Sequence, residues 1–136
     1  MYIRDSEQKK LKMVTLTLEL DWTYEHFLTY ILFVVASADL SVDHDELIEI
    51  KTILTTEGIS EEEYSKIKDE VLSKLALQST LRQKETFIKS NKDYFLDCEE
   101  KKEQIVSSIE DVIAADLSVD ENEFITYRTI KAILLG

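Results

Sequence analysis

The six-residue sequence Ala-Asp-Leu-Ser-Val-Asp occurs twice in this chain, at residues 38–43 and again at residues 115–120. The similarity extends beyond these six positions. Residues 35–53 and 112–130, which are offset by 77 positions, share 11 identities over 19 aligned residues. A repeat at a fixed offset indicates that the fold contains two related structural units.

The composition favours an all-helical fold. The chain of 136 residues has no proline and only two glycines, whereas sheet proteins need such residues in their turns. Apolar residues recur at helical spacing, and we expect about six to seven helices. Six ranges are predicted to be helical: 23–38, 43–56, 60–77, 80–97, 99–116 and 120–135.

Four of these helices share a design at their start, in which apolar residues flank a polar N-cap in a hydrophobic staple. The staples are Trp22-Thr23-Phe27, Val42-Asp43-Leu47, Ile59-Ser60-Tyr64 and Val119-Asp120-Phe124. The last three also have glutamate three residues after the N-cap, at Glu46, Glu63 and Glu123, which predicts capping boxes. Gly58 is predicted to end the helix before it.

The repeat predicts two helix–acidic loop–helix units, at about residues 23–57 and 99–135, within one domain over residues 21–136. Residues 1–20 are predicted to be an extension or lead-in, in which apolar and polar residues alternate over residues 14–20 as in a strand. The helix over 80–97 is less regular, and a break near Asn91 is left open.

The net charge of −12 bears on partners and location. It argues against nucleic acid and anionic lipid as partners, and it fits a cation or a basic partner.

Cys98 is the only cysteine, so no internal disulfide is predicted. The apolar run over 27–38 is too short to span a membrane, and Glu25 interrupts any leader before it. We therefore expect a cytoplasmic protein without an integral membrane segment.

Both repeated loops concentrate oxygen-bearing side chains. The candidate ligands for a cation are Asp39, Asp43, Glu46, Asp116, Asp120 and Glu123, with Ser41, Asp45, Ser118 and Asn122 nearby. A set made only of oxygen ligands suits a hard divalent cation such as Ca²⁺, Mg²⁺ or Mn²⁺.

The spacing of these acids resembles the start of an EF-hand loop, but two positions argue against that motif. The sixth position, which needs glycine, is His44 or Glu121, and the twelfth, which needs glutamate, is Ile50 or Tyr127. Helix capping alone is the competing explanation for the loop acids. It leaves Asp39 and Asp116 unexplained, because each follows a helix C-terminus, where the helix dipole disfavours negative charge.

At these residues the sequence resembles the TerB family of tellurite-resistance proteins and the N-terminal region of DjlA-type co-chaperones. The resemblance covers about residues 21–135. It rests on an apolar helix ending in Ala38-Asp39 and followed by Glu46, and on the same pattern at Ala115-Asp116 and Glu123. It implies an all-helical duplicated fold, acidic positions that bind a metal, and a role in stress or tellurite response. The family has glycine where this chain has Leu40 and Leu117.

No catalytic set is evident, because the chain lacks a phosphate-binding glycine-rich loop and a Ser-His-Asp signature. We expect a non-enzymatic stress-response module whose acidic loops bind a divalent cation. The alternative is a scaffolding domain that binds a protein partner and uses the loop acids only as helix caps. Aromatic residues that could meet such a partner, or pack in the core by default, are Tyr24, Tyr30, Phe33, Tyr94 and Phe95.

Overall fold

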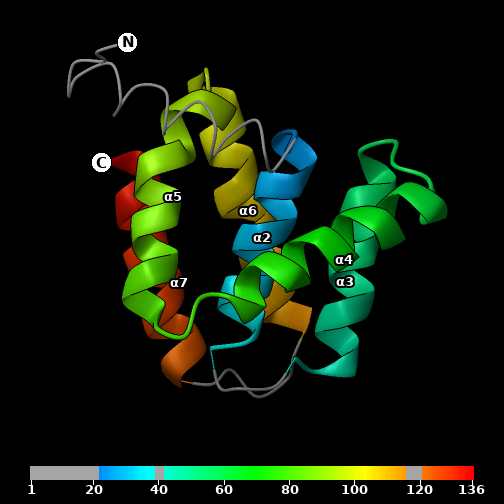
Figure 1. The fold of residues 1–136 in the computed structure, drawn as a ribbon, viewed down its shortest axis with the longest axis horizontal. Helices are drawn as coiled ribbons and strands as arrows, with labels where there is room; N and C mark the ends of the chain where they lie inside the picture. The colour runs from blue at the N-terminus through cyan, green and yellow to red at the C-terminus, as the bar shows by residue number, and fades with distance from the viewer. Residues whose placement is uncertain (1–21, 39–41, 116–120) are drawn as a thin grey trace, which may run out of the picture.

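The computed structural model describes residues 22–38, 42–115 and 121–136, and these ranges contain six α-helices and no strand (Figure 1). The helices are α2 (Tyr24–Ala36), α3 (His44–Thr56), α4 (Glu61–Ala76), α5 (Leu81–Phe95), α6 (Glu99–Ala115) and α7 (Glu121–Leu135). The all-helical prediction is confirmed for this part of the chain. The strand-like pattern over residues 14–20 lies outside the described residues.

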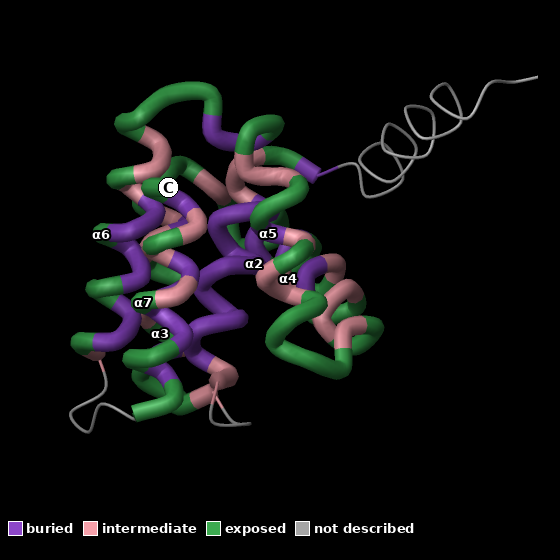
Figure 2. The backbone as a smooth tube through the Cα atoms, turned by 90° about the vertical axis from the view of Figure 1, so that its left-hand side faces the viewer, coloured by how far each residue is buried: buried purple, intermediate pink, exposed green. Residues whose placement is uncertain are grey.

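Helix α2 is the centre of the fold. All of its residues from His26 to Ala36 are buried, and it contacts each of α3, α4, α5, α6 and α7. Figure 2 shows this helix as a continuous buried segment, with exposed stretches on the helices around it. The helix is buried on all sides because its sequence has no polar face. Apolar residues such as Phe27, Ile31 and Val34 lie around the whole helix.

The surrounding helices each turn one apolar stripe toward α2 and keep a polar face outside, as expected for surface helices. Helix α4, for example, buries Tyr64, Ile67 and Val71. Of the aromatic residues considered for a partner surface, Tyr30, Phe33 and Phe95 are buried and Tyr24 is partly buried, whereas Tyr94 is 64% exposed. Core packing therefore accounts for all of them except Tyr94.

A histidine ties the start of α2 to α4. The ring Nδ1 of His26 accepts the backbone N–H of Thr23 at 3.2 Å, so the proton of the neutral ring lies on Nε2 and is donated to Glu70 Oε2 at 2.8 Å. The ring also stacks on Trp22, with centroids 5.6 Å apart. The side chain thus completes the N-cap of one helix and sets the position of another.

Two of the three predicted capping boxes lie within the described residues, whereas the third includes Asp120, which lies outside them. The capping box of Asp43 and Glu46 is formed. Ser60 accepts the backbone N–H of Glu63 at 3.2 Å, but the predicted reciprocal bond from the exposed Glu63 carboxylate is not formed within this described segment. A box that the prediction missed forms between Thr80 and Gln83, where glutamine takes the place of glutamate.

Helix α5 is continuous from Leu81 to Phe95, so the break left open near Asn91 does not occur. The Asn91 side chain donates to the carbonyl oxygen of Phe87 at 2.8 Å, one turn earlier on the same helix. This bond satisfies the amide locally, and the polar residue is therefore compatible with an unbroken helix.

Gly58 ends α3 as predicted. Its φ of 95° lies in the region that L side chains rarely adopt, and Ile59 N–H then bonds back to the carbonyl of Leu54 at 3.2 Å. A Cβ at this position would meet no atom within 4 Å. Glycine is needed here for its backbone conformation rather than for space.

None of the described helices is long and apolar enough to cross a membrane. Residues 27–36 are buried within α2, as predicted for a core helix.

We predict that Gly58→Ala lowers the free energy of unfolding by about 1–2 kcal/mol, because alanine must adopt a positive φ. Gly58→Asn should cost less, since asparagine tolerates positive φ better than alanine does. Urea unfolding of the three proteins measures both differences. Equal stability of the alanine variant and the parent would contradict the assigned turn.

We also predict a loss of stability at alkaline pH. Burial raises the pKa of Tyr24, Tyr30 and Tyr64 above the ordinary value of 10.0, and the nearby carboxylates of Glu57 and Glu25 raise the pKa of Tyr24 further. A raised pKa in the folded state gives stability that is complete below about pH 10 and is lost as the pH rises above it.

The measurement is the ultraviolet absorbance of tyrosinate during a pH titration, followed alongside circular dichroism. The buried tyrosines should ionise only together with unfolding. Replacing Tyr30 with Phe should weaken the alkaline destabilisation, whereas Tyr94→Phe at the exposed position should leave it unchanged. The prediction would be wrong if all tyrosines ionised near pH 10 while circular dichroism still showed a helical protein.

Candidate functional site

Four helix ends gather at one end of the molecule. Helices α2 and α6 finish there and helices α3 and α7 begin there, at the bottom of Figure 1, and Figure 2 shows the same grouping after a quarter turn. These are the helix ends that flank residues 39–41 and 116–120. The helices that flank the two repeated segments therefore share one end of the fold.

The six predicted ligands divide into two groups. Asp39, Asp116 and Asp120 lie outside the described residues. Asp43, Glu46 and Glu123 are described, and all three lie at or near the N-termini of α3 and α7. Their environments differ, since Asp43 is exposed whereas the two glutamates are 1% and 0% exposed.

Glu46 is held in a defined orientation. Its Oε1 accepts the backbone N–H of Asp43 at 3.2 Å, and the Asp43 side chain accepts the N–H of Asp45 at 3.3 Å. The staple and capping-box sequence thus produces the local structure that it predicts. The same bond directs the carboxylate inward, toward the start of the helix.

Glu123 occupies the equivalent position in the second repeat. Helix α7 begins at Glu121 and helix α3 begins at His44, which is the repeat offset of 77 residues, so each glutamate is the third residue of its helix. Among the described residues, Glu46 and Glu123 are the only acidic side chains that are buried. The repeat therefore places two buried carboxylates in matching positions.

Burial of a carboxylate has a physical cost. Removing a carboxylate from water costs several kcal/mol unless charges or hydrogen-bond donors surround it. The dipole of the following helix favours a negative charge at its N-terminus by about 0.3–1 kcal/mol. A glutamate buried at a helix start therefore depends on hydrogen-bond donors or positive charge close to it.

A cation site of three or more acidic, histidine or cysteine side chains does not form within residues 22–38, 42–115 and 121–136 alone. Any such site that uses Glu46 or Glu123 would therefore include a residue outside this part of the chain, and Asp39, Asp116 and Asp120 are the predicted candidates.

The last ligand of an EF-hand loop is at its twelfth position, and Ile50 and Tyr127 occupy that position here. Both residues have other roles. Ile50 is fully buried in the core. The hydroxyl of Tyr127 donates to Glu110 Oε2 at 2.9 Å and links α7 to α6. Neither residue is a carboxylate near the loop, which agrees with the argument against an EF-hand.

The sequence did not predict the burial of the two glutamates, since capping alone accounts for an exposed carboxylate equally well. One feature of the sequence could have indicated it. Glutamate is identical at this position of both repeats, whereas the two preceding pairs, His44/Glu121 and Asp45/Asn122, differ.

Comparison with known proteins finds no matching family model, no similar curated protein and no similar solved structure. The resemblance to the TerB family therefore stays a prediction.

We predict that Glu46→Ala is clearly more destabilising than Glu63→Ala, by about 1–2 kcal/mol in the free energy of unfolding. Both residues are the third of their helix, but only Glu46 is buried and forms the reciprocal bond. Urea unfolding in a chelating buffer compares them. Equal losses in the two variants would contradict a special role for the buried position.

Proposed function

We propose that this chain is a TerB-like, non-enzymatic stress-response module of the cytoplasm whose two acidic segments together bind a divalent cation. The observation that carries the proposal is the burial of Glu46 and Glu123 in matching positions at one end of the fold. The proposed ligands are drawn from Asp39, Asp43, Glu46, Asp116, Asp120 and Glu123.

The chemistry of these side chains supports a hard cation. Carboxylate oxygens are the preferred ligands of Ca²⁺, Mg²⁺ and Mn²⁺, and a buried carboxylate gains more from a cation than an exposed one does. Because the flanking helix ends share one end of the molecule, one shared site is favoured over two separate sites (Figure 1).

The proposal includes an internal duplication within a single domain over residues 21–136. In it, α2 with α3 and α6 with α7 are two copies of one helix–loop–helix unit. Support comes from the repeated sequence and from the starts of α3 and α7, which are separated by the repeat offset. Helices α4 and α5 would then join the two copies.

One observation favours the alternative of a scaffolding domain that binds a protein. The capping box of Asp43 and Glu46 is formed, so these acids already have a role that needs no metal. In that case the acidic segments stabilise helix starts, and function resides on another surface.

The test is thermal unfolding of the chelated protein, followed by addition of Ca²⁺, Mg²⁺ or Mn²⁺. A cation at 100 times its Kd should raise the free energy of unfolding by about 2.7 kcal/mol, which is a shift of several degrees in Tm. The double variants Asp39→Asn/Asp116→Asn and Glu46→Gln/Glu123→Gln should both lose the shift.

The control is Glu62→Gln/Glu63→Gln, which removes two exposed carboxylates from the start of α4 and should keep the full shift. If no cation stabilises the parent protein, the metal proposal is wrong and the scaffolding alternative is preferred. If only one of the two glutamates matters in single variants, the two segments do not share a site.

A further inference from the structure

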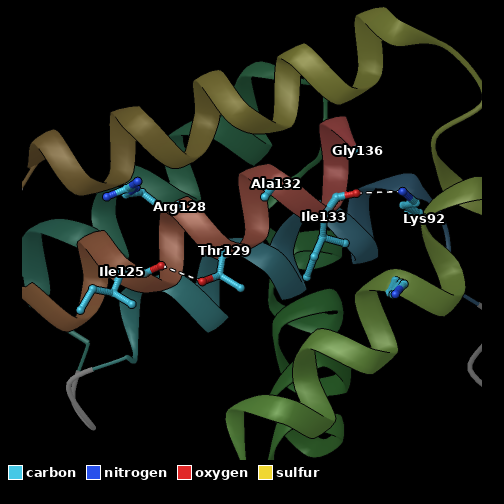
Figure 3. A pocket seen from close by; sticks show the side chains of 8 residues that line it. Lys92, Ile125, Arg128, Thr129, Ala132, Ile133 and Gly136 are labelled. Atoms are coloured by element: carbon cyan, nitrogen blue, oxygen red, sulfur yellow. Dashed lines mark hydrogen bonds between the residues drawn. The ribbon is translucent and has the colours of Figure 1, made fainter.

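A hollow of about 690 Å³ lies between α5 and α7 (Figure 3). Its apolar wall comes from Ile125, Ala132 and Ile133 on α7. Its charged lining residues are Lys89 and Lys92 on α5 and Arg128 on α7, and none of the described acidic residues lines it. This volume is within the range of small-molecule pockets.

The charge of this hollow is opposite to that of the chain. The protein has 28 acidic and 16 basic side chains, so a basic residue would ordinarily find an acidic neighbour. Yet within the described part of the chain the ion pairs involve His26, Lys51, Lys101 and Lys102, and none includes a lining residue of the hollow. Three cationic side chains thus line this hollow without an ion pair among the described residues, and the Arg128 guanidinium lies 6.0 Å from the centre of the Phe124 ring.

The cations are placed along the length of the hollow. Figure 3 shows Lys92 beside the C-terminal end of α7 and Arg128 further toward its start. Lys92 Nζ donates to the backbone oxygen of Ile133 at 2.8 Å, which fixes the ammonium at the edge of the apolar wall. From Ile125 to Gly136 the wall spans about 16 Å at the helical rise of 1.5 Å per residue.

We propose that the groove between α5 and α7 binds a small amphiphilic anion, namely an aliphatic chain that ends in a carboxylate or a phosphate. The chain would lie along Ile125 and Ile133 and cover their exposed surface, which favours binding in proportion to the apolar area removed from water. The oxyanion would accept charge-assisted hydrogen bonds from the lysines or the arginine.

A single ligand molecule fits better than a membrane surface. The net charge of −12 opposes approach to an anionic bilayer, whereas one anion entering the groove interacts mainly with the local cations. The proposal uses residues separate from those of the cation site and does not depend on it.

The test is isothermal titration of the full chain with decanoate and with octyl phosphate, below their micelle concentrations. We expect saturable binding of at least one of them, and the two headgroups distinguish a carboxylate from a phosphate ligand. Octyltrimethylammonium and inorganic phosphate should not bind, because the first has the wrong charge and the second has no apolar chain.

Two pairs of matched variants locate the site. Lys89→Gln/Arg128→Gln should weaken binding about tenfold or more, whereas Lys66→Gln/Arg82→Gln removes the same charges from exposed positions elsewhere and should not. Ile125→Ser should weaken binding, whereas Ile48→Ser should not, although both isoleucines are 51% exposed.

Three results would overturn the proposal. The first is that octyltrimethylammonium binds as well as the anions do. The second is that the matched control variants lose as much affinity as the groove variants. The third is that an acidic amphipathic peptide binds while neither anion does. The last result would reassign the groove as a protein interface.

Discussion

The burial of α2 on every side is the constraint on which the rest of the structure depends. A helix with no polar face must be covered completely, and five helices share this task. Each of them then needs only one apolar stripe, which leaves its outer face free to be highly charged. The same arrangement fixes where the helices end. Helices α2 and α6 end where α3 and α7 begin, so the helices that flank both repeated segments share one end of the molecule (Figure 1).

The buried glutamates show how a local motif acquires a tertiary role. A capping glutamate needs only to reach back to the N-cap, and Glu63 at the start of α4 remains exposed in that position. Glu46 and Glu123 lie at helix starts that are covered by the remainder of the fold, so the same side chain becomes a buried charge. This difference between equivalent positions separates a purely local role from one that involves neighbouring elements.

Much of the helical layout could be predicted from the sequence, because staples, caps and apolar spacing are local signals. The predicted starts of α3 and α4 and the role of Gly58 agree with the structure for this reason. The candidate site was only partly predictable. Its residues follow from the repeat, but the burial of Glu46 depends on packing between distant segments. The groove between α5 and α7 was not predictable either, since Lys89 and Arg128 come from separate helices and show no common spacing. The Asn91 side chain bonds to the backbone of the unbroken α5, and periodicity does not reveal this bond.

The central position of α2 also has a consequence for how the chain reaches its native state. This most apolar helix is made before the helices that cover it, and one of these, α7, lies about 100 residues later. At the usual rate of about 5–20 residues per second, the apolar segment waits several seconds on the ribosome for its last partner. During that time Phe27–Ala36 is a hydrophobic stretch without its native cover, and it is the segment on which a chaperone, or aggregation, would act first.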